Sequence, residues 1–215
     1  MKNAAYQGLR LSYSGKKKLI SARLDEFREV FEKGDDRRIF EELVFCIFTA
    51  NASAKMALKS VDAVRGIMMD GSKREISKRL RHAHRFPNTR SNYIVLTREY
   101  LRRKFDFKLR DLIFSFEGPS ARRDFFASED IMGLGYKEAS HFLRNIGFRG
   151  YAILDKHILR SLYEFGVLDS SKPPTTKNRY IETENKFKEF ANQLGIQLDE
   201  LDLLLWSEKT GEILK

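Results

Sequence analysis

The fold of this chain is decided by one stretch, Ile131–Arg160, which reads IMGLGYKEASHFLRNIGFRGYAILDKHILR. Its pattern predicts a helix, a glycine-rich hairpin, a second helix, a short extended link and the start of a further helix. Gly133 and Gly135 permit a tight turn and let the backbone approach a ligand closely. The N–H groups of the hairpin and of the helix that follows would point outward, where the helix dipole favours phosphate.

Amphipathic segments flank the hairpin, RRDFFASEDI before it and EASHFLRNIG after it. Together they fit a helix-hairpin-helix, a motif whose phosphate contacts position a duplex without reading its sequence. A bare Gly-x-Gly is a weak signal, because many helices end in glycine. The flanking helices and Ala139 at a close-packing position strengthen it, whereas Met132 stands where this hairpin often has proline.

Lys137 and Asp155 each stand where a predicted helix begins. The positive end of a helix disfavours an ammonium group, and an amine must lose its proton before it can attack carbon. We therefore interpret Lys137 as a candidate nucleophile and Asp155 as its candidate partner. Taken singly, Lys137 could equally be a cation that contacts phosphate, and Asp155 could equally be a helix N-cap.

The composition points towards a polyanionic partner. The 215 residues carry a formal charge of +10 at pH 7, and nucleic acid is favoured over an acidic membrane surface or acidic proteins. Charge alone leaves open a basic protein that is merely soluble. Cys46 is the single cysteine, so neither a disulfide within the chain nor a four-cysteine iron–sulfur site can form. It lies in the apolar run ELVFCIFTA and is predicted to be a buried hydrophobic residue.

Almost every segment has helical spacing, and no alternation is long enough for a sheet. We expect a helix over 16–33, a central apolar helix over 39–50 with a cap at Asp35 or Asp36, and one beginning after Ser53. The residues Tyr151–Leu154 are the best strand candidate but are short. No apolar stretch reaches a membrane span and the N-terminus lacks a signal-peptide core, so a cytoplasmic protein is expected.

Three further residues have a structural reading beside a functional one. Asn51 follows a helix end, where asparagine is usually a cap or turn residue. Arg90 lies in the first turn of the helix predicted over 87–104, where the dipole disfavours a cation, and this placement indicates a role outside the helix. Surface arginines are common, so an ordinary surface residue is the alternative. Trp206 is the single tryptophan, and simple packing on the apolar face of the last helix is favoured for it on composition.

The segments GLGYKEASHFLRNIG and LDKHILRSLYEFG resemble the helix-hairpin-helix DNA glycosylase superfamily. Within it, the chain is most similar to the second class of 8-oxoguanine DNA glycosylase/AP lyases, small enzymes known mainly from archaea and thermophilic bacteria. Weaker matches run from Asn51 to the C-terminus. The resemblance implies an all-α fold of two helical lobes with the active site in the cleft between them, residues 38–147 forming one lobe and residues 1–37 with 148–215 the other.

The resemblance also implies roles for single residues. Lys137 matches the lysine that displaces the base and forms a Schiff base with the sugar, and Asp155 matches the aspartate that stabilises the cationic transition state. His157 matches a histidine that contacts a phosphate near the lesion. The remaining matches are Asn51 and Arg90 for the gap left by the flipped base and the orphan cytosine, Gly133 and Gly135 for the phosphate-binding hairpin, and Lys215 and Trp206 for recognition of the oxidised base, through the terminal carboxylate and the wall of its pocket.

The implied activity is excision of 8-oxoguanine from duplex DNA, with the lesion opposite cytosine, followed by strand cleavage through β-elimination. No cofactor is expected, although the hairpin carbonyls of this family often hold Na⁺ or K⁺. The protein is expected to be a prokaryotic monomer associated with the nucleoid through DNA. Two alternatives stay open: a glycosylase for oxidised pyrimidines, which commonly carries four clustered cysteines absent here, and a non-catalytic DNA-binding module.

Overall fold

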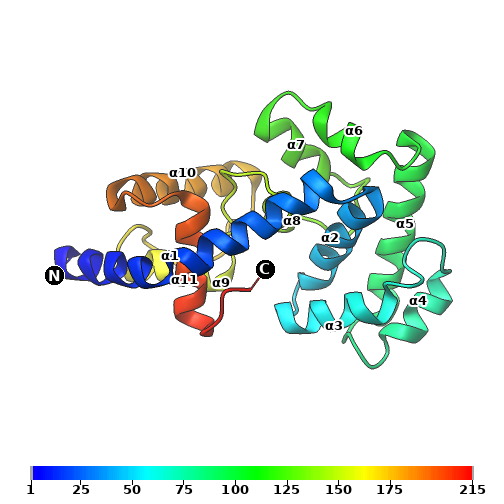
Figure 1. Ribbon diagram of the computed structural model, residues 1–215, viewed down its shortest axis with the longest axis horizontal. Coiled ribbons are helices and arrows are strands. Elements are labelled where there is room, and N and C mark those ends of the chain that lie inside the picture. Colours follow the sequence, from blue (N-terminus) through cyan, green and yellow to red (C-terminus); the bar gives the residue numbers. More distant parts are fainter. Residues whose placement is uncertain (1, 215) are drawn as a thin grey trace. The chain divides into compact units, whose positions relative to one another are not determined.

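The computed structural model describes residues 2–214, and within that range the secondary structure is helical, with no strand. This confirms the predicted all-α class. The helices, shown in Figure 1, are α1 (Lys2–Lys33), α2 (Asp36–Thr49), α3 (Ala54–Val64), α4 (Lys73–Leu80), α5 (Pro87–Phe105), α6 (Leu109–Phe114), α7 (Gly118–Phe126), α8 (Tyr136–Asn145), α9 (Lys156–Glu164), α10 (Lys177–Leu194) and α11 (Leu198–Thr210). Across residues 2–214, no helix combines the length and the apolar character needed to cross a bilayer.

The chain divides into two compact units. The first consists of Met1–Arg28 with Leu143–Lys215, and the second is Glu29–Phe142. The predicted lobes, 38–147 and 1–37 with 148–215, have other boundaries than these units. The structural boundaries fall inside α1 and α8, two helices that contribute residues to both units.

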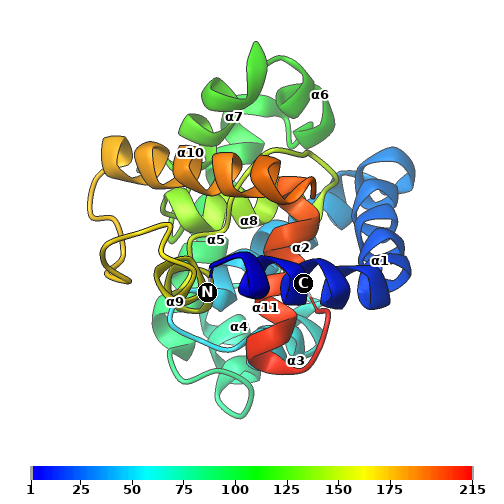
Figure 2. The same cartoon turned by 90° about the vertical axis from the view of Figure 1, so that its left-hand side faces the viewer.

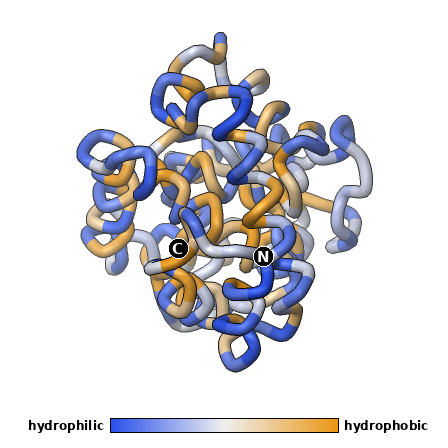
Figure 3. The backbone as a smooth tube through the Cα atoms, turned by 90° about the vertical axis from the view of Figure 1, so that its right-hand side faces the viewer, coloured by the Kyte–Doolittle hydropathy of each residue, from blue (hydrophilic) through white to orange (hydrophobic). Residues whose placement is uncertain are grey.

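The core of the second unit is built around α2. Its residues from Ile39 to Phe48 are buried, apart from the half-buried Glu41, and it packs against α3, α5 and α6. Fully burying one large apolar side chain contributes about 1.5–3 kcal/mol, so a helix that is apolar nearly all round belongs at such a centre. Cys46 is fully buried here, as predicted. Figure 3 shows hydrophilic segments mainly at the outer turns of the tube.

Helix starts follow the predicted capping residues. Asp35 Oδ1 accepts a hydrogen bond from the Arg38 N–H at 2.8 Å, and Ser53 Oγ accepts one from the Met56 N–H at 3.2 Å. These bonds satisfy N–H groups that have no partner inside their own helix. The pair Gly118-Pro119 begins α7 after the end of α6, because proline fits the first turn of a helix, where its missing N–H is not needed.

The N-terminal helix is longer than its sequence pattern predicted, since α1 begins at Lys2 rather than at residue 16. Its added turns include two glycines, each costing about 1 kcal/mol in a helix. Long-range contacts inside the first unit offset that cost. The Arg10 guanidinium donates to the carbonyls of Leu194 and Gln193, and Tyr13 Oη donates to Glu200 at 2.8 Å.

Candidate active site

The hairpin between α7 and α8 lies in the second unit. Gly133 has φ +86°, and a Cβ atom there would lie 2.4 Å from Cδ2 of Tyr93 on α5. Both facts require glycine at this position. Met132 N–H donates to Thr97 Oγ1 at 3.0 Å, so the turn is also anchored to α5 by a hydrogen bond. Gly135 is different, because its φ is not left-handed and a Cβ would meet nothing closer than 3.4 Å.

The two helices of the motif are locked together by Arg123 of α7, which is 4% exposed. Its guanidinium lies 4.8 Å from the ring centroid of Tyr136, and its Nη1 donates to Ser140 Oγ at 3.3 Å. A guanidinium over a phenol ring adds a cation–π attraction to the packing. The hairpin is therefore held from α5 and from both flanking helices.

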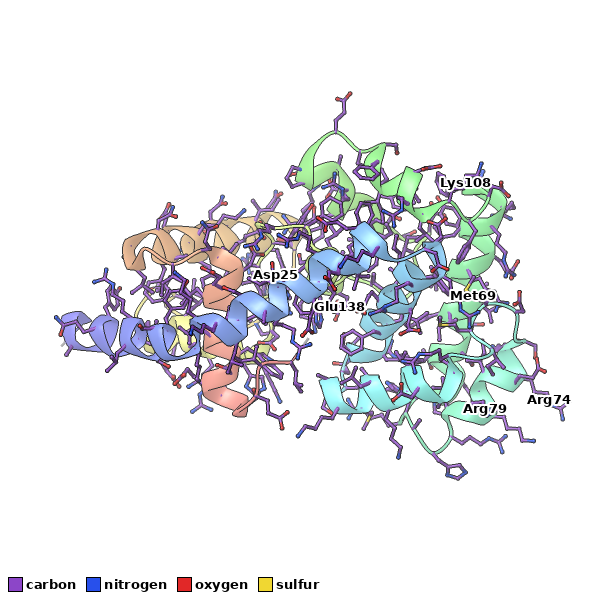
Figure 4. The ribbon with its side chains drawn as sticks, viewed as in Figure 1. Asp25, Met69, Arg74, Arg79, Lys108 and Glu138 are labelled. Carbon is purple, nitrogen blue, oxygen red and sulfur yellow. The ribbon has the colours of Figure 1, made fainter. Side chains whose placement is uncertain are left out.

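Lys137 is the second residue of α8, and its side chain is 31% exposed. Its Nζ lies 2.9 Å from Oε1 of Glu138, while Oε2 of the same carboxylate accepts from the Gly135 N–H at 3.3 Å. Figure 4 labels Glu138 on its helix. Such an ion pair has to open before the lysine amine can attack carbon.

Glu138 was not among the site residues predicted from the sequence. A signal for it was present, because a glutamate three residues after the residue that precedes a helix often bonds back to the N–H of that residue. Gly135 and Glu138 have this spacing. The hydrogen bond ties the backbone of the hairpin to the carboxylate that pairs with Lys137.

Asp155 is the N-cap of α9 in the first unit. Its Oδ1 accepts from the N–H groups of His157 at 2.8 Å and Ile158 at 2.9 Å, and Oδ2 takes part in neither bond. The structural reading of Asp155 is therefore confirmed. Its chemical role, and that of the half-buried His157, stay predictions. The same holds for the predicted approach of Lys137 and Asp155, which belong to different units.

Four residues of the second unit form what we call the Phe86 cluster: Asn51, Arg85, Phe86 and Arg90. Arg85 donates to the carbonyl of Asn51, and Arg90 donates to the carbonyl of Ala50. The guanidinium carbons lie 4.7 Å (Arg85) and 5.9 Å (Arg90) from the ring centroid of Phe86. The two residues predicted to act together, Asn51 and Arg90, are thus brought to one place.

The residues of the Phe86 cluster differ in their solvent exposure. Phe86 is 41% exposed and Arg90 is 6% exposed, and burial lowers the pKa of the Arg90 guanidinium. Asn51 has φ +60°, a left-handed turn conformation that asparagine tolerates. An exposed ring beside two guanidinium groups can stack with a nucleobase while the cations meet phosphate or a base edge.

Arg85, Phe86 and His84, the residue that anchors Phe86, were not predicted from the sequence. Its Nδ1 accepts from the Phe86 N–H at 3.0 Å, and its Nε2 lies 3.1 Å from the Phe48 carbonyl. One nitrogen accepts and the other donates, which is the pattern of a neutral ring. Burial lowers the pKa of His84, in agreement. An aromatic residue between two arginines was the signal in the sequence.

The remaining predicted positions are distributed as follows. Helix α4 presents exposed cations, among them Arg74 and Arg79, which extend outward in Figure 4. Trp206 is half-buried on α11, which ends at Gly211. Lys215 lies outside the described residues. For residues 2–214, no three His, Cys, Asp or Glu side chains are grouped as a metal site.

Known proteins show which family the chain belongs to. A family model described as 8-oxoguanine DNA glycosylase matches residues 20–196. Two relatives are named 8-oxoguanine DNA glycosylase/AP lyase: that of Methanocaldococcus jannaschii is 36% identical over 93% of each chain. That of Korarchaeum cryptofilum is 38% identical over 96% of this chain and 95% of its own.

A solved structure shares the fold. It is the M. jannaschii 8-oxoguanine glycosylase/lyase in complex with a 15mer DNA containing 8-oxoguanine, with a TM-score of 0.86 and 34% identity, covering 96% of this chain and 99% of that one. These matches confirm the resemblance first inferred from the hairpin and the segment after it. The chain belongs to the 8-oxoguanine DNA glycosylase family.

Proposed function

We propose that this protein excises 8-oxoguanine from duplex DNA and then cleaves the strand at the resulting abasic site. The observation that carries the proposal is the near full-length match to relatives named 8-oxoguanine DNA glycosylase/AP lyase. A lysine that follows the helix-hairpin-helix turn at the start of α8 supports the chemistry. The basic composition, with 40 Lys and Arg against 30 Asp and Glu, supports DNA as the partner.

The first chemical step would belong to Lys137. A base inside a duplex has to be flipped out before an amine can reach its sugar, at a cost of roughly a few kcal/mol. The neutral amine attacks C1′ with its lone pair as the glycosidic C–N bond breaks, and the base leaves with that electron pair and gains a proton. The carboxylate of Asp155 would stabilise the positive charge that develops on the sugar.

Strand cleavage follows from the same amine. The nitrogen loses a proton, the ring oxygen leaves C1′, and the C1′=N iminium makes the protons on C2′ acidic. Loss of one such proton forms the C2′–C3′ double bond and expels the 3′ phosphate. A lysine nucleophile therefore accounts for lyase activity without a further group.

Borohydride reduction tests the proposal, because it converts the iminium into a stable adduct. The protein is incubated with duplexes that carry 8-oxoguanine opposite cytosine, an oxidised pyrimidine, or no lesion. We expect an adduct on the 8-oxoguanine duplex alone. Lys137→Gln should abolish it, and the matched control Lys156→Gln, an exposed lysine in the first turn of α9, should retain it.

The other outcomes identify the alternatives. An adduct on the oxidised pyrimidine alone would make the protein a glycosylase of another lesion class. DNA binding without an adduct on any duplex would leave a binding module. An adduct that survives in Lys137→Gln would show that another amine is the nucleophile.

The remaining expectations are part of the same proposal. Base recognition by Trp206 and Lys215 predicts that Trp206→Ala slows excision more than cleavage of a preformed abasic site.

The lysine chemistry requires no cofactor, so activity should survive EDTA. A monovalent ion on the hairpin carbonyls would make duplex affinity differ between K⁺ and tetramethylammonium buffers of equal ionic strength. A cytoplasmic, nucleoid-associated monomer is the proposed state, and light scattering tests the monomer.

A further inference from the structure

The link between α8 and α9 has an unusual support in the first unit. Residues Tyr151–Leu154 are buried, each at most 6% exposed, yet they are extended without pairing to a strand. A buried backbone N–H has to find an acceptor. Here the acceptors are side chains: Ala152 N–H donates to Glu184 Oε1 at 2.9 Å, and Ile153 N–H donates to Asp202 Oδ2 at 3.0 Å.

Two more bonds of the same kind flank these. Leu154 N–H donates to the Tyr180 hydroxyl at 3.3 Å, and the Gly150 N–H donates to the Asp199 carboxylate at 3.1 Å. The acceptors come from α10 and α11, which Figure 2 shows in orange and red. Side-chain oxygens therefore accept the backbone hydrogen bonds of this link, as the carbonyls of a neighbouring strand do in a sheet.

Asp202 is the most constrained of these acceptors. It is 2% exposed, and its second oxygen, Oδ1, lies 2.7 Å from Nη1 of Arg144, which is 4% exposed. Burial raises the pKa of Asp202 to about 7, against the opposing effects of Arg144 and the Ile153 N–H. Burying a carboxylate costs several kcal/mol, and a neutral acceptor would serve the N–H with less cost.

The link ends at Asp155. The Asp155 N–H donates to the Ile153 carbonyl at 2.7 Å and closes a tight turn. The position of Asp155 therefore depends on the position of Ile153. Asp155 then caps α9 through its Oδ1. Two hydrogen bonds, one from the Ile153 N–H to the Asp202 carboxylate and one between backbone groups, thus connect Asp202 to the residue proposed to stabilise the cationic transition state. The charge on Asp155 also contributes to raising the pKa of Asp202, so the two carboxylates interact electrostatically.

We propose that Asp202, paired with Arg144, is a positioning residue for Asp155: it holds the extended link so that the Asp155 carboxylate is set in place for base excision. The inference rests on the proposed function. It deepens that function by naming what supports the second catalytic group. Asp202 itself would not contact DNA.

A double-mutant cycle separates positioning from simple stabilisation. Single-turnover excision is measured for Asp202→Ala and Asp202→Asn, each alone and combined with Asp155→Asn, at a temperature where all variants are folded. We expect Asp202→Ala to slow excision about tenfold while duplex affinity changes less than about twofold. In the Asp155→Asn background the further loss should be under about twofold, because residues acting as a unit are not additive.

Hydrogen exchange measures how firmly the backbone amides of the link are held. In the Asp202 variants, exchange should rise in peptides covering residues 151–158, while peptides of α10 keep their protection. The matched control is Glu200→Gln, on the same helix, whose carboxylate accepts from Tyr13 rather than from the link. It should leave both excision and exchange over 151–158 unchanged. If Asp202→Ala does not fold, the double-mutant cycle is measured with the nearly isosteric Asp202→Asn alone.

Three outcomes would overturn the inference: unchanged excision in both Asp202 variants, an additive loss in the Asp155→Asn background, or unchanged exchange over 151–158. Failure of the proposed function looks different, because the wild-type protein would then give no borohydride adduct. In that case the exchange measurement still decides whether Asp202 holds the link.

Discussion

At the residue scale, the two hairpin glycines differ in what they require. Gly133 combines a left-handed backbone with a Tyr93 ring 2.4 Å from where a Cβ would stand, whereas Gly135 has neither constraint. Both were predicted to belong to the phosphate-binding turn. The spacing Gly-x-Gly locates the turn, but the conformation of each glycine depends on the neighbours that the fold brings up to it.

Gly133→Ala should therefore be much more damaging than Gly135→Ala. A left-handed conformation costs a residue with a Cβ about 1–2 kcal/mol, and the contact with Tyr93 adds to that cost. We expect a lower Tm and weaker binding to undamaged duplex for Gly133→Ala, with Gly135→Ala close to wild type in Tm. Thermal unfolding and fluorescence anisotropy measure the two quantities. Equal effects of both substitutions would contradict this account.

Phe86 offers a second prediction at the residue scale. Stacking of one base on an aromatic ring is worth about 1–3 kcal/mol. Because Phe86 is 41% exposed, Phe86→Ala should weaken binding to a lesion duplex about tenfold or more and change the Tm little. Leu96→Ala, a comparably exposed apolar residue on α5, is the control. Affinity that is unaltered in Phe86→Ala would exclude a stacking role.

At the element scale, hydrogen bonds from side chains determine where helices begin and how the link between α8 and α9 is held. Helix starts could be predicted because caps act locally, as at Asp35 and Ser53. The early start of α1 and the side chains that support Tyr151–Leu154 could not, because their partners are more than a hundred residues away in one case and up to 49 residues away in the other. Long-range bonds of this kind leave no periodic trace in the sequence.

The buried Asp202 predicts a pH effect on the first unit. Its pKa is raised from 3.8 to about 7, so the folded state holds this proton more tightly than the unfolded state does. The destabilising contribution is fully present above pH 7 and is lost as the pH falls from about 7 towards 4. Arg144, Asp155 and Asp199 are the charged groups that act on it.

Chemical unfolding at pH 5 and pH 8 measures this effect. Asp202→Asn removes this titrating group, so the stability of the variant should change less between pH 5 and pH 8 than that of the wild type. The difference between wild type and variant should be larger at pH 5, where the wild-type proton stabilises the fold. The Glu200→Gln control should follow the wild-type dependence on pH. A wild-type advantage that grows towards pH 8 would contradict the raised pKa.

At the scale of the whole molecule, the charge of +10 makes DNA affinity depend on salt. Each phosphate contact adds about 0.9 to the slope of log K against log salt. Arg74→Gln combined with Arg79→Gln should lower the slope by about 0.9 for each contact that α4 makes. Lys186→Gln, a cation that pairs with Glu182 on α10, serves as the control. An unchanged slope in the α4 variant would remove that helix from the DNA-binding surface.

The sequence alone determined the helical class, the hairpin, the capping residues and the candidate pair Lys137 and Asp155. These features are local: periodicity, glycine spacing and capping act within a few residues and can be read from one segment. The composition and the matching segments then indicated a family that the comparisons confirmed.

Only the tertiary structure decided which residues support those candidates. Glu138 beside Lys137, the Phe86 cluster and the Asp202–Arg144 pair beneath the link all depend on side-chain positions in the folded chain. The physical reason is that a carboxylate buried against a distant backbone N–H has the same sequence signature as any helical Asp or Glu. Folding alone distinguishes them, by removing water from one and leaving it around the others.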